Sequence, residues 1–231
     1  MPDGRHTLEV DLASVADDRS YEIHIGRGLI GDAAVWRAAT QDRGVVLVTD
    51  DQVGPLYGPA VKSALSEAAQ ITEVVLPAGE ESKHLDSVQQ ILDAALADKH
   101  ERSSLFVALG GGVVGDMTGF AAACFLRGAD FVQVPTTLLA QVDSSVGGKT
   151  GVNHKMGKNL IGAFHQPKQV LIDLDTLATL PEREFSAGLA EVVKYGLIRD
   201  AEFFSWLIQN VSALKDREPG AVAYAIQRSC A

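Results

Sequence analysis

The central part of the chain alternates short apolar runs with longer segments whose apolar residues recur at helical spacing. The short runs are rich in Val, Leu and Ile and have the length of buried strands. In the longer segments, residues such as Leu85, Val88 and Leu92 fall on one face of a helix. Strands that alternate with helices are typical of a parallel sheet covered on both faces, so the sequence predicts an α/β fold. The predicted strands are 44–50, 72–77, 104–109 and 131–135, and the predicted helices are 56–69, 84–99 and 116–127.

The two ends of the chain have different patterns. Near the amino terminus, residues 7–10 and 21–25 alternate in strand fashion and predict an antiparallel pair. Beyond residue 180 the pattern is helical only, so we expect an α/β domain over residues 1–180 and the beginning of a helical domain over residues 181–231. The last apolar pattern reaches Ala231 without a capping residue, and we expect the sequence to end inside a helix. The predicted helices of this part are 182–196, 201–211 and 219 onward.

Composition narrows the class of protein. With 231 residues, 46% hydrophobic and 22% charged, the chain can bury a full core. No apolar run is long enough to span a bilayer, and the first residues contain no apolar segment behind a basic one, so we expect neither a signal peptide nor a membrane partner. The two cysteines do not predict a disulfide framework, and a cytoplasmic location is expected. A net charge of −10 argues against a nucleic-acid partner.

A glycine-rich turn follows the predicted strand 104–109 and opens a helix. Gly110, Gly112 and Gly115 form the pattern G-x-G-x-x-G, and backbone amides at such a helix start can hold a pyrophosphate. In a standard dinucleotide fold the motif follows the first strand, and an acid about 20 residues later binds the ribose. Here that position holds Pro-Thr-Thr, so the ribose acid is expected to be Asp50 instead. A tight strand–helix turn with no ligand is the alternative.

A second candidate region is free of acids. Between Ser144 and Ile172 there is no Asp or Glu, although the protein is acidic overall. Lysines on a glycine-rich loop favour a phosphate or carboxylate site, while a solvated basic loop is the alternative. Asp143 stands alone just before this stretch. The lysines of the stretch are Lys149, Lys155, Lys158 and Lys168.

Glu191 and Lys194 lie three residues apart, so they project from one face of a predicted helix. They are either a surface ion pair or a metal-binding carboxylate beside a substrate-binding ammonium. The six histidines form no H-x-x-x-H or H-E-x-x-H pair, and none follows His165.

Taken together, these motifs resemble those of the 3-dehydroquinate synthase family, within the sugar phosphate cyclases. The resemblance implies a parallel-sheet NAD-binding domain followed by a helical metal and substrate domain. It implies an NAD- and Zn²⁺- (or Co²⁺-) dependent lyase that converts 3-deoxy-D-arabino-heptulosonate 7-phosphate to 3-dehydroquinate and phosphate, a step of the shikimate pathway. The route would be transient oxidation by NAD, β-elimination of phosphate, re-reduction and an intramolecular aldol reaction. The matching segments are 110–122, 127–128, 133–150, 157–167, 175–181 and 188–196.

The resemblance also implies roles for individual residues. Glu191 would be a zinc ligand, and Lys194 and Asp143 would bind substrate hydroxyls. The residues implied at the substrate phosphate are Lys149, Asn159 and, from a neighbouring subunit of a homodimer, Arg127. The residues implied around NAD are Asp50, Gly79, Glu80, Lys83, Gly112, Val113, Val114, Gly115, Asp116, Thr136, Thr137, Lys149, Lys158, Thr176, Leu177, Ala178 and Thr179.

The chain departs from the family in one respect. The family has two histidine zinc ligands and further basic residues beyond the position that corresponds to residue 231. We therefore expect an amino-terminal portion that is inactive as it stands. The alternatives are another sugar phosphate cyclase, a metal-dependent polyol dehydrogenase, and an NAD-binding module without activity.

Overall fold

The computed structural model describes residues 20–230, and its centre is a parallel sheet. The strand order is β1-β8-β5-β4-β2-β3, and every neighbouring pair is parallel, as the alternating pattern predicts. The six strands are β1 (Glu22–Gly26), β2 (Gly44–Asp50), β3 (Gln70–Leu76), β4 (Leu105–Gly110), β5 (Asp130–Pro135) and β8 (Gln169–Asp173).

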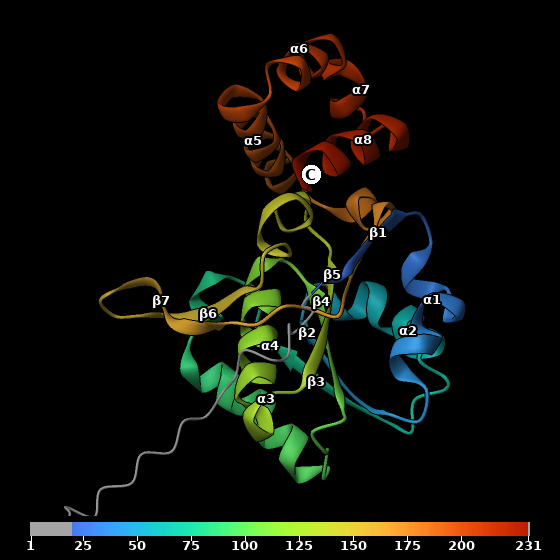
Figure 1. Ribbon diagram of the computed structural model, residues 1–231, viewed down its shortest axis with the longest axis vertical. Coiled ribbons are helices and arrows are strands. Elements are labelled where there is room, and N and C mark those ends of the chain that lie inside the picture. Colours follow the sequence, from blue (N-terminus) through green and yellow to red (C-terminus); the bar gives the residue numbers. More distant parts are fainter. Residues whose placement is uncertain (1–19, 231) are drawn as a thin grey trace, which may run out of the picture.

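Helices cover both faces of the sheet (Figure 1). Side chains alternate along β2, so Val46 and Val48 pack on the face of α3 and α4, whereas Val45 and Leu47 pack on the face of α1 and α2. Burial on both faces explains the continuous apolar composition of the strands. These helices are α1 (Ala33–Thr40), α2 (Gly54–Ala64), α3 (Leu85–Ala97) and α4 (Gly112–Cys124).

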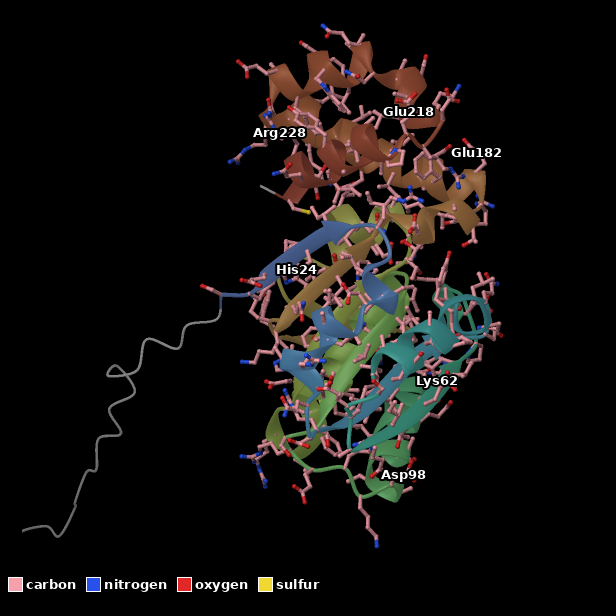
Figure 2. The ribbon with its side chains drawn as sticks, turned by 90° about the vertical axis from the view of Figure 1, so that its right-hand side faces the viewer. His24, Lys62, Asp98, Glu182, Glu218 and Arg228 are labelled. Atoms are coloured by element: carbon pink, nitrogen blue, oxygen red, sulfur yellow. The ribbon has the colours of Figure 1, made fainter. Side chains whose placement is uncertain are left out.

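A helical layer lies beyond the carboxyl ends of the strands (Figures 1 and 2). Phe185, Val192 and Ile226 of this layer share one apolar cluster with Val170 and Ile172 of β8. No helix within residues 20–230 has the length and apolarity needed to cross a membrane. The domain boundary near residue 180 stays a prediction. The helices are α5 (Glu182–Arg199), α6 (Ala201–Gln209), α7 (Val211–Lys215) and α8 (Pro219–Cys230), and the short turns that connect the sheet are η1 (Leu29–Gly31), η2 (Glu80–Ser82), η3 (Phe125–Arg127), the π-helical η4 (Ala140–Ser144) and η5 (Leu174–Thr179).

The acid-free stretch is an antiparallel hairpin rather than the predicted loop. Its strands are β6 (Lys149–His154) and β7 (Gly157–Phe164), and it projects beside α4 (Figure 1). Gly147 and Gly148 precede it with positive φ angles of 93° and 67°, which glycine adopts without strain.

Other differences from the predicted elements are local. Strand 21–25 is β1, but it pairs in parallel with β8, and its expected antiparallel partner at 7–10 lies outside the described residues. Helix α1 was not predicted, and the Asp32 carboxylate caps it by accepting from the N–H of Ala34 at 2.9 Å. The predicted helix 56–69 ends at Ala64, and the predicted helix 201–211 is divided at Asn210.

Candidate cofactor and substrate site

The glycine-rich turn connects β4 to α4 at the carboxyl edge of the sheet. The first backbone bond of the helix runs from the N–H of Gly115 to the carbonyl of Gly111, so the amides of its first turn face outward. A Cβ at Gly112 would lie 2.7 Å from Ser144 Oγ, and one at Gly115 would lie 2.5 Å from Gln133 Oε1. The helix start therefore packs closely against the side chains of Ser144 and Gln133, and its free amides can accept an anion.

Asp50 ends the neighbouring strand β2. It is 8% exposed, and its Oδ1 accepts from the N–H groups of Gln52 at 3.0 Å and Val53 at 2.8 Å, at the entrance to α2. From the same helix, the Tyr57 hydroxyl lies 3.1 Å from the carbonyl of Thr176 and 2.6 Å from Thr179 Oγ1. Tyr57 thus connects α2, which follows β2, to the turn η5 at the carboxyl edge of the sheet.

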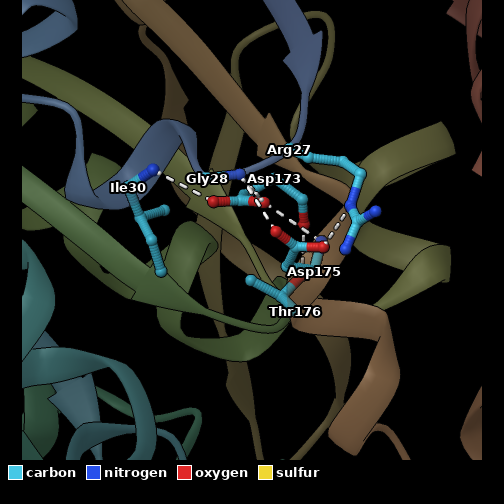
Figure 3. Close-up of polar contacts among 6 residues, drawn as sticks. All are labelled: Arg27, Gly28, Ile30, Asp173, Asp175 and Thr176. Atoms are coloured by element: carbon cyan, nitrogen blue, oxygen red, sulfur yellow. Dashed lines mark hydrogen bonds and ion pairs between the residues drawn. The ribbon is translucent and has the colours of Figure 1, made fainter.

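A buried aspartate fixes the turn η5 (Figure 3). Asp173 is 1% exposed and accepts from the N–H groups of Gly28 at 3.0 Å, Ile30 at 3.1 Å and Asp175 at 3.0 Å. Its own carbonyl accepts from Thr176 Oγ1 at 2.7 Å. Residues 176–179, which the family resemblance implies at NAD, are therefore held to β8 and to the segment that follows β1.

The end of β5 completes this edge. The N–H of Thr136 donates to the carbonyl of Gly110 at 2.9 Å, and within residues 20–230 its buried hydroxyl makes no hydrogen bond. The Gln141 amide, which sequence reasoning did not single out, donates to the carbonyl of Pro135 at 3.1 Å and to Thr176 Oγ1 at 3.3 Å. Thr137 Oγ1 accepts from a backbone N–H of the same turn at 3.1 Å. The unpaired Thr136 hydroxyl and the open helix start fit a polar, phosphate-bearing ligand.

A buried lysine connects α4 to the hairpin. Lys83 is 6% exposed, and its Nζ contacts the carboxylate of Asp116 and donates to Asn159 Oδ1 at 2.6 Å. Burial raises the pKa of Asp116 above its usual value, against the opposing effect of Lys83. Next to this pair, Glu80 Oε1 accepts from Asn153 Nδ2 at 2.9 Å and lies 3.3 Å from Lys158 Nζ. Burial acts to raise the pKa of Glu80, but these hydrogen bonds and the lysine charges outweigh it and lower the pKa.

The second cluster joins the helical layer to the turn η4. The carboxylate of Glu191 pairs with the ammonium of Lys194, and this hydrogen bond raises the pKa of Lys194. The Tyr195 hydroxyl donates to the carbonyl of Val142 at 3.2 Å and approaches Asp143 Oδ1 at 3.4 Å. Burial, followed by the charges of Asp143 and Glu191, raises the pKa of Tyr195, so its hydroxyl stays protonated.

The two clusters are adjacent, because Ser144 packs against Gly112 and the charge of Asp143 acts on Asp116. Lys149 is exposed at the start of β6, on the same hairpin as Asn159.

Arg127 does not lie with the other candidate residues. It lies just before the first residue of β5 and therefore at the opposite edge of the sheet, where this chain does not bring it to the other candidates. Gly79 precedes η2 with a positive φ of 110°.

The described residues do not form a metal site on their own. Within residues 20–230 no group of three or more His, Cys, Asp or Glu side chains could hold a metal ion. Glu191 is a single candidate ligand, and it is already paired with Lys194. A zinc centre requires three or four protein ligands, so the residues present do not fit one.

Three side chains at the site were missed by sequence reasoning: Gln141, Asn153 and Tyr195. Asn153 lies inside the acid-free stretch, and Gln141 and Tyr195 lie inside two of the matching segments. Their position beside implied site residues could have marked them as candidates. Their hydrogen-bond partners could not be identified from the sequence, because these partners are distant in sequence or lie on another element.

Comparison with known proteins shows the family of this chain. The family model described as 3-dehydroquinate synthase N-terminal matches residues 73–187, and the one described as 3-dehydroquinate synthase C-terminal matches residues 188–231. A chloroplastic 3-dehydroquinate synthase from Arabidopsis thaliana is 53% identical over 96% of this chain and 50% of its own length. This chain thus spans about half the length of that curated relative.

Similar solved structures include other sugar phosphate cyclases. A 2-epi-5-epi-valiolone synthase from Streptomyces hygroscopicus, with NAD⁺ and Zn²⁺ bound, has a TM-score of 0.83 and 32% identity, over 98% of this chain and 61% of that one. A 2-deoxy-scyllo-inosose synthase, complexed with carbaglucose-6-phosphate, NAD⁺ and Co²⁺, has a TM-score of 0.75 and 29% identity, over 89% of this chain and 57% of that one. With two adjoining family models matched over residues 73–231, the chain belongs to the 3-dehydroquinate synthase family.

Proposed function

We propose that this chain supplies the cofactor-binding part, and some of the substrate-binding residues, of a 3-dehydroquinate synthase. The proposed reaction converts 3-deoxy-D-arabino-heptulosonate 7-phosphate to 3-dehydroquinate and phosphate. The observation that carries the proposal is the junction of two clusters at the carboxyl edge of the sheet, one around Lys83 and one around Glu191. Such an edge is where ligands bind in open parallel sheets. The identity of 53% to the Arabidopsis enzyme supports the choice of reaction.

NAD would lie along the edge formed by Asp50, the start of α4, Thr136 and the turn η5. The outward-facing amides of the first turn of α4 would bind its pyrophosphate, and the Asp50 carboxylate would accept from a ribose hydroxyl. NAD supplies a hydride acceptor and donor when it is bound. The remaining residues proposed around it are Gly79, Glu80, Lys83, Gly112, Val113, Val114, Gly115, Asp116, Thr137, Lys149, Lys158, Thr176, Leu177, Ala178 and Thr179.

The substrate would lie between the hairpin and the helical layer. Because Asn159 Oδ1 accepts from Lys83, the NH₂ end of Asn159 is available to donate to a phosphate oxygen beside the charge of Lys149. Asp143 would accept from a substrate hydroxyl, and Lys194 would donate to one. Glu191 is the metal ligand that this chain would offer, and the other ligands would have to come from outside residues 20–230.

Arg127 would act in a neighbouring subunit, since it lies at the opposite edge of its own sheet. We therefore propose a homodimer in which each site receives one arginine from its partner. The cytoplasmic location stays a prediction, because the plant relative is named as a chloroplast protein.

Calorimetric titration with NAD⁺ tests the cofactor site on this chain alone. We expect binding, and we expect Asp50→Asn to weaken it by about 10- to 100-fold, since a hydrogen bond to a charged group contributes about 1.5–3 kcal/mol. The Oδ1 of Asn can still accept from the N–H groups of Gln52 and Val53 before α2, so the fold is kept. An absence of heat at millimolar NAD⁺, with the protein folded, would exclude the proposal.

Another sugar phosphate cyclase is the second candidate, because the two similar solved structures are a valiolone and an inosose synthase. Phosphate release by the full-length protein from heptulosonate phosphate, sedoheptulose 7-phosphate and glucose 6-phosphate separates these substrates. A cyclase regenerates its cofactor, so no NADH accumulates at 340 nm, whereas a polyol dehydrogenase would accumulate it.

A further inference from the structure

The hairpin is irregular at one place, where Asn153 of β6 faces residues 158–160 of β7. Val152 pairs with Ile161 and His154 pairs with Gly157, so one residue of β6, Asn153, faces three residues of β7, 158–160, and the bulge lies in β7. Bulges occur beside active sites, where the local twist redirects a side chain. Asn153 faces this bulge from β6, and its half-buried side chain reaches Glu80 in the turn η2.

Asn153 makes three contacts of good length. Its N–H donates to the carbonyl of Lys83 at 2.9 Å, and its Nδ2 donates to Glu80 Oε1 at 2.9 Å. Its Oδ1 accepts from the N–H of Asn159 at 2.9 Å. A flipped amide would set NH₂ against the N–H of Asn159 and an oxygen against a carboxylate, so one orientation is compatible with both partners.

Asn159 has a left-handed backbone, with a φ of 55°. Asn tolerates this region better than most residues, but it still needs support from its surroundings. Asn153 holds the backbone of Asn159, and Lys83 holds its side-chain oxygen at 2.6 Å. These two bonds direct the NH₂ end of Asn159, the group proposed to bind phosphate.

Two links join the hairpin to Glu80. The contact from Lys158 is 3.3 Å long and its side chain is 74% exposed, so screening by water makes it weak. The hydrogen bond from the Asn153 amide is shorter, at 2.9 Å, and the backbone N–H of Asn153 also donates to the carbonyl of Lys83. Asn153 is therefore the stronger connection between the turn η2 and the phosphate-binding end of the hairpin.

We propose that Asn153 is a positioning residue that couples the cofactor turn η2 to Asn159, so that NAD⁺ and phosphate strengthen each other's binding. This inference rests on the proposed function, which assigns Glu80 and Lys83 to the cofactor and Asn159 to phosphate. Coupling of this kind is reciprocal, so each ligand must change the affinity of the other by the same factor.

The test exchanges the amide of Asn153 and the carboxylate of Glu80 between their two positions. Asn153→Asp keeps the acceptor for the N–H of Asn159 but sets a carboxylate against Glu80. Adding Glu80→Gln restores one amide and one carboxylate in reversed positions. Hydrogen exchange of the Asn159 N–H is measured in each variant, with Glu80→Gln alone and Asn210→Asp as controls. Asn210 donates its Nδ2 to a backbone carbonyl at 2.9 Å in the helical layer, away from the hairpin.

We expect hydrogen exchange of the Asn159 N–H to be about tenfold faster in Asn153→Asp than in the wild type, equivalent to about 1.4 kcal/mol. In the exchanged pair, Asn153→Asp with Glu80→Gln, the rate should return to within about threefold of the wild-type rate. Calorimetry then measures the NAD⁺ affinity with and without inorganic phosphate. The wild-type chain should show mutual strengthening, Asn153→Asp should lose it, and the exchanged pair should recover it.

Unchanged exchange in Asn153→Asp, or no recovery in the exchanged pair, would overturn the inference. Binding of NAD⁺ and phosphate without mutual strengthening in the wild type would also overturn it. A wild-type chain that binds neither ligand would refute the proposed function instead, and the exchange rates would still decide whether Asn153 holds Asn159.

Discussion

Replacement of Lys83 by Met tests the buried ion pair on which both ligand regions depend. Lys83 and Asp116 have side chains that are 6% and 16% exposed, so removal of the ammonium leaves a buried carboxylate without its counter-charge. Breaking a buried pair in this way costs about 3–5 kcal/mol. The residual exposure of Asp116 favours the lower end, about 3 kcal/mol, which with a slope of about 3 kcal/mol per molar urea lowers the unfolding midpoint by about 1 M.

The stability lost in Lys83→Met should increase with pH. Burial raises the pKa of Asp116 above 3.8, so the folded protein retains this proton to a higher pH than the unfolded chain. Stability from this group is present below the unfolded pKa and is lost as pH rises through the folded pKa. Without Lys83 the folded pKa rises further, and the loss should be larger at pH 8 than at pH 5.

Urea unfolding at both pH values measures these effects. The control is the double variant Lys83→Met with Asp116→Asn, which has no buried charge and should recover about half of the loss. If Lys83→Met is within about 0.5 kcal/mol of wild type at pH 8, or if its loss is the same at both pH values, the ion pair does not stabilise the fold as argued.

Three further predictions concern the scaffold. Burial lowers the pKa of His100, so the stability that its neutral form contributes is complete above pH 6.5 and is lost as pH falls below that value. His100→Gln should remove this part of the pH dependence of urea unfolding, and an unaltered pH dependence would contradict the role of His100. A Cβ at Gly119 would lie 2.4 Å from Thr150 Cγ2, so Gly119→Ala should cost about 1–3 kcal/mol, more than the ~1 kcal/mol gained in helix propensity; Thr150→Ser, which removes that methyl group, should recover most of the lost melting temperature, and a failure to do so would locate the strain elsewhere. Asp173→Asn sets an NH₂ group among backbone donors and should cost about 2 kcal/mol, with faster hydrogen exchange at Gly28; unchanged exchange there would argue against the anchoring role.

Local patterns were sufficient for β2, β3, β4 and β5 and for most of the helices that cover the sheet, but not for β8 or for the parallel pairing of β1. A parallel sheet buries both faces of its strands, which leaves continuous apolar runs such as 104–109 that can be recognised from the sequence. Helix α1 was missed because it has only eight residues and one capping side chain, Asp32. The hairpin was missed because Gly151 and Gly162 weaken its strand pattern. A Cβ at either position would lie within 2.4 Å of the facing strand's backbone.

The candidate residues stay predictions, although the structure brings many of them together. The acid-free stretch and the glycine turn can be read along the chain because their chemistry is concentrated in consecutive residues. The sequence by itself therefore determined the fold class, the family and the kinds of ligand to expect. Only the tertiary structure decided that Lys83 bonds to Asn159, 76 residues away, and that Arg127 lies at the opposite edge from Asp143. Such contacts depend on how strands are ordered in the sheet, and the local periodicity of side chains carries no information about that order.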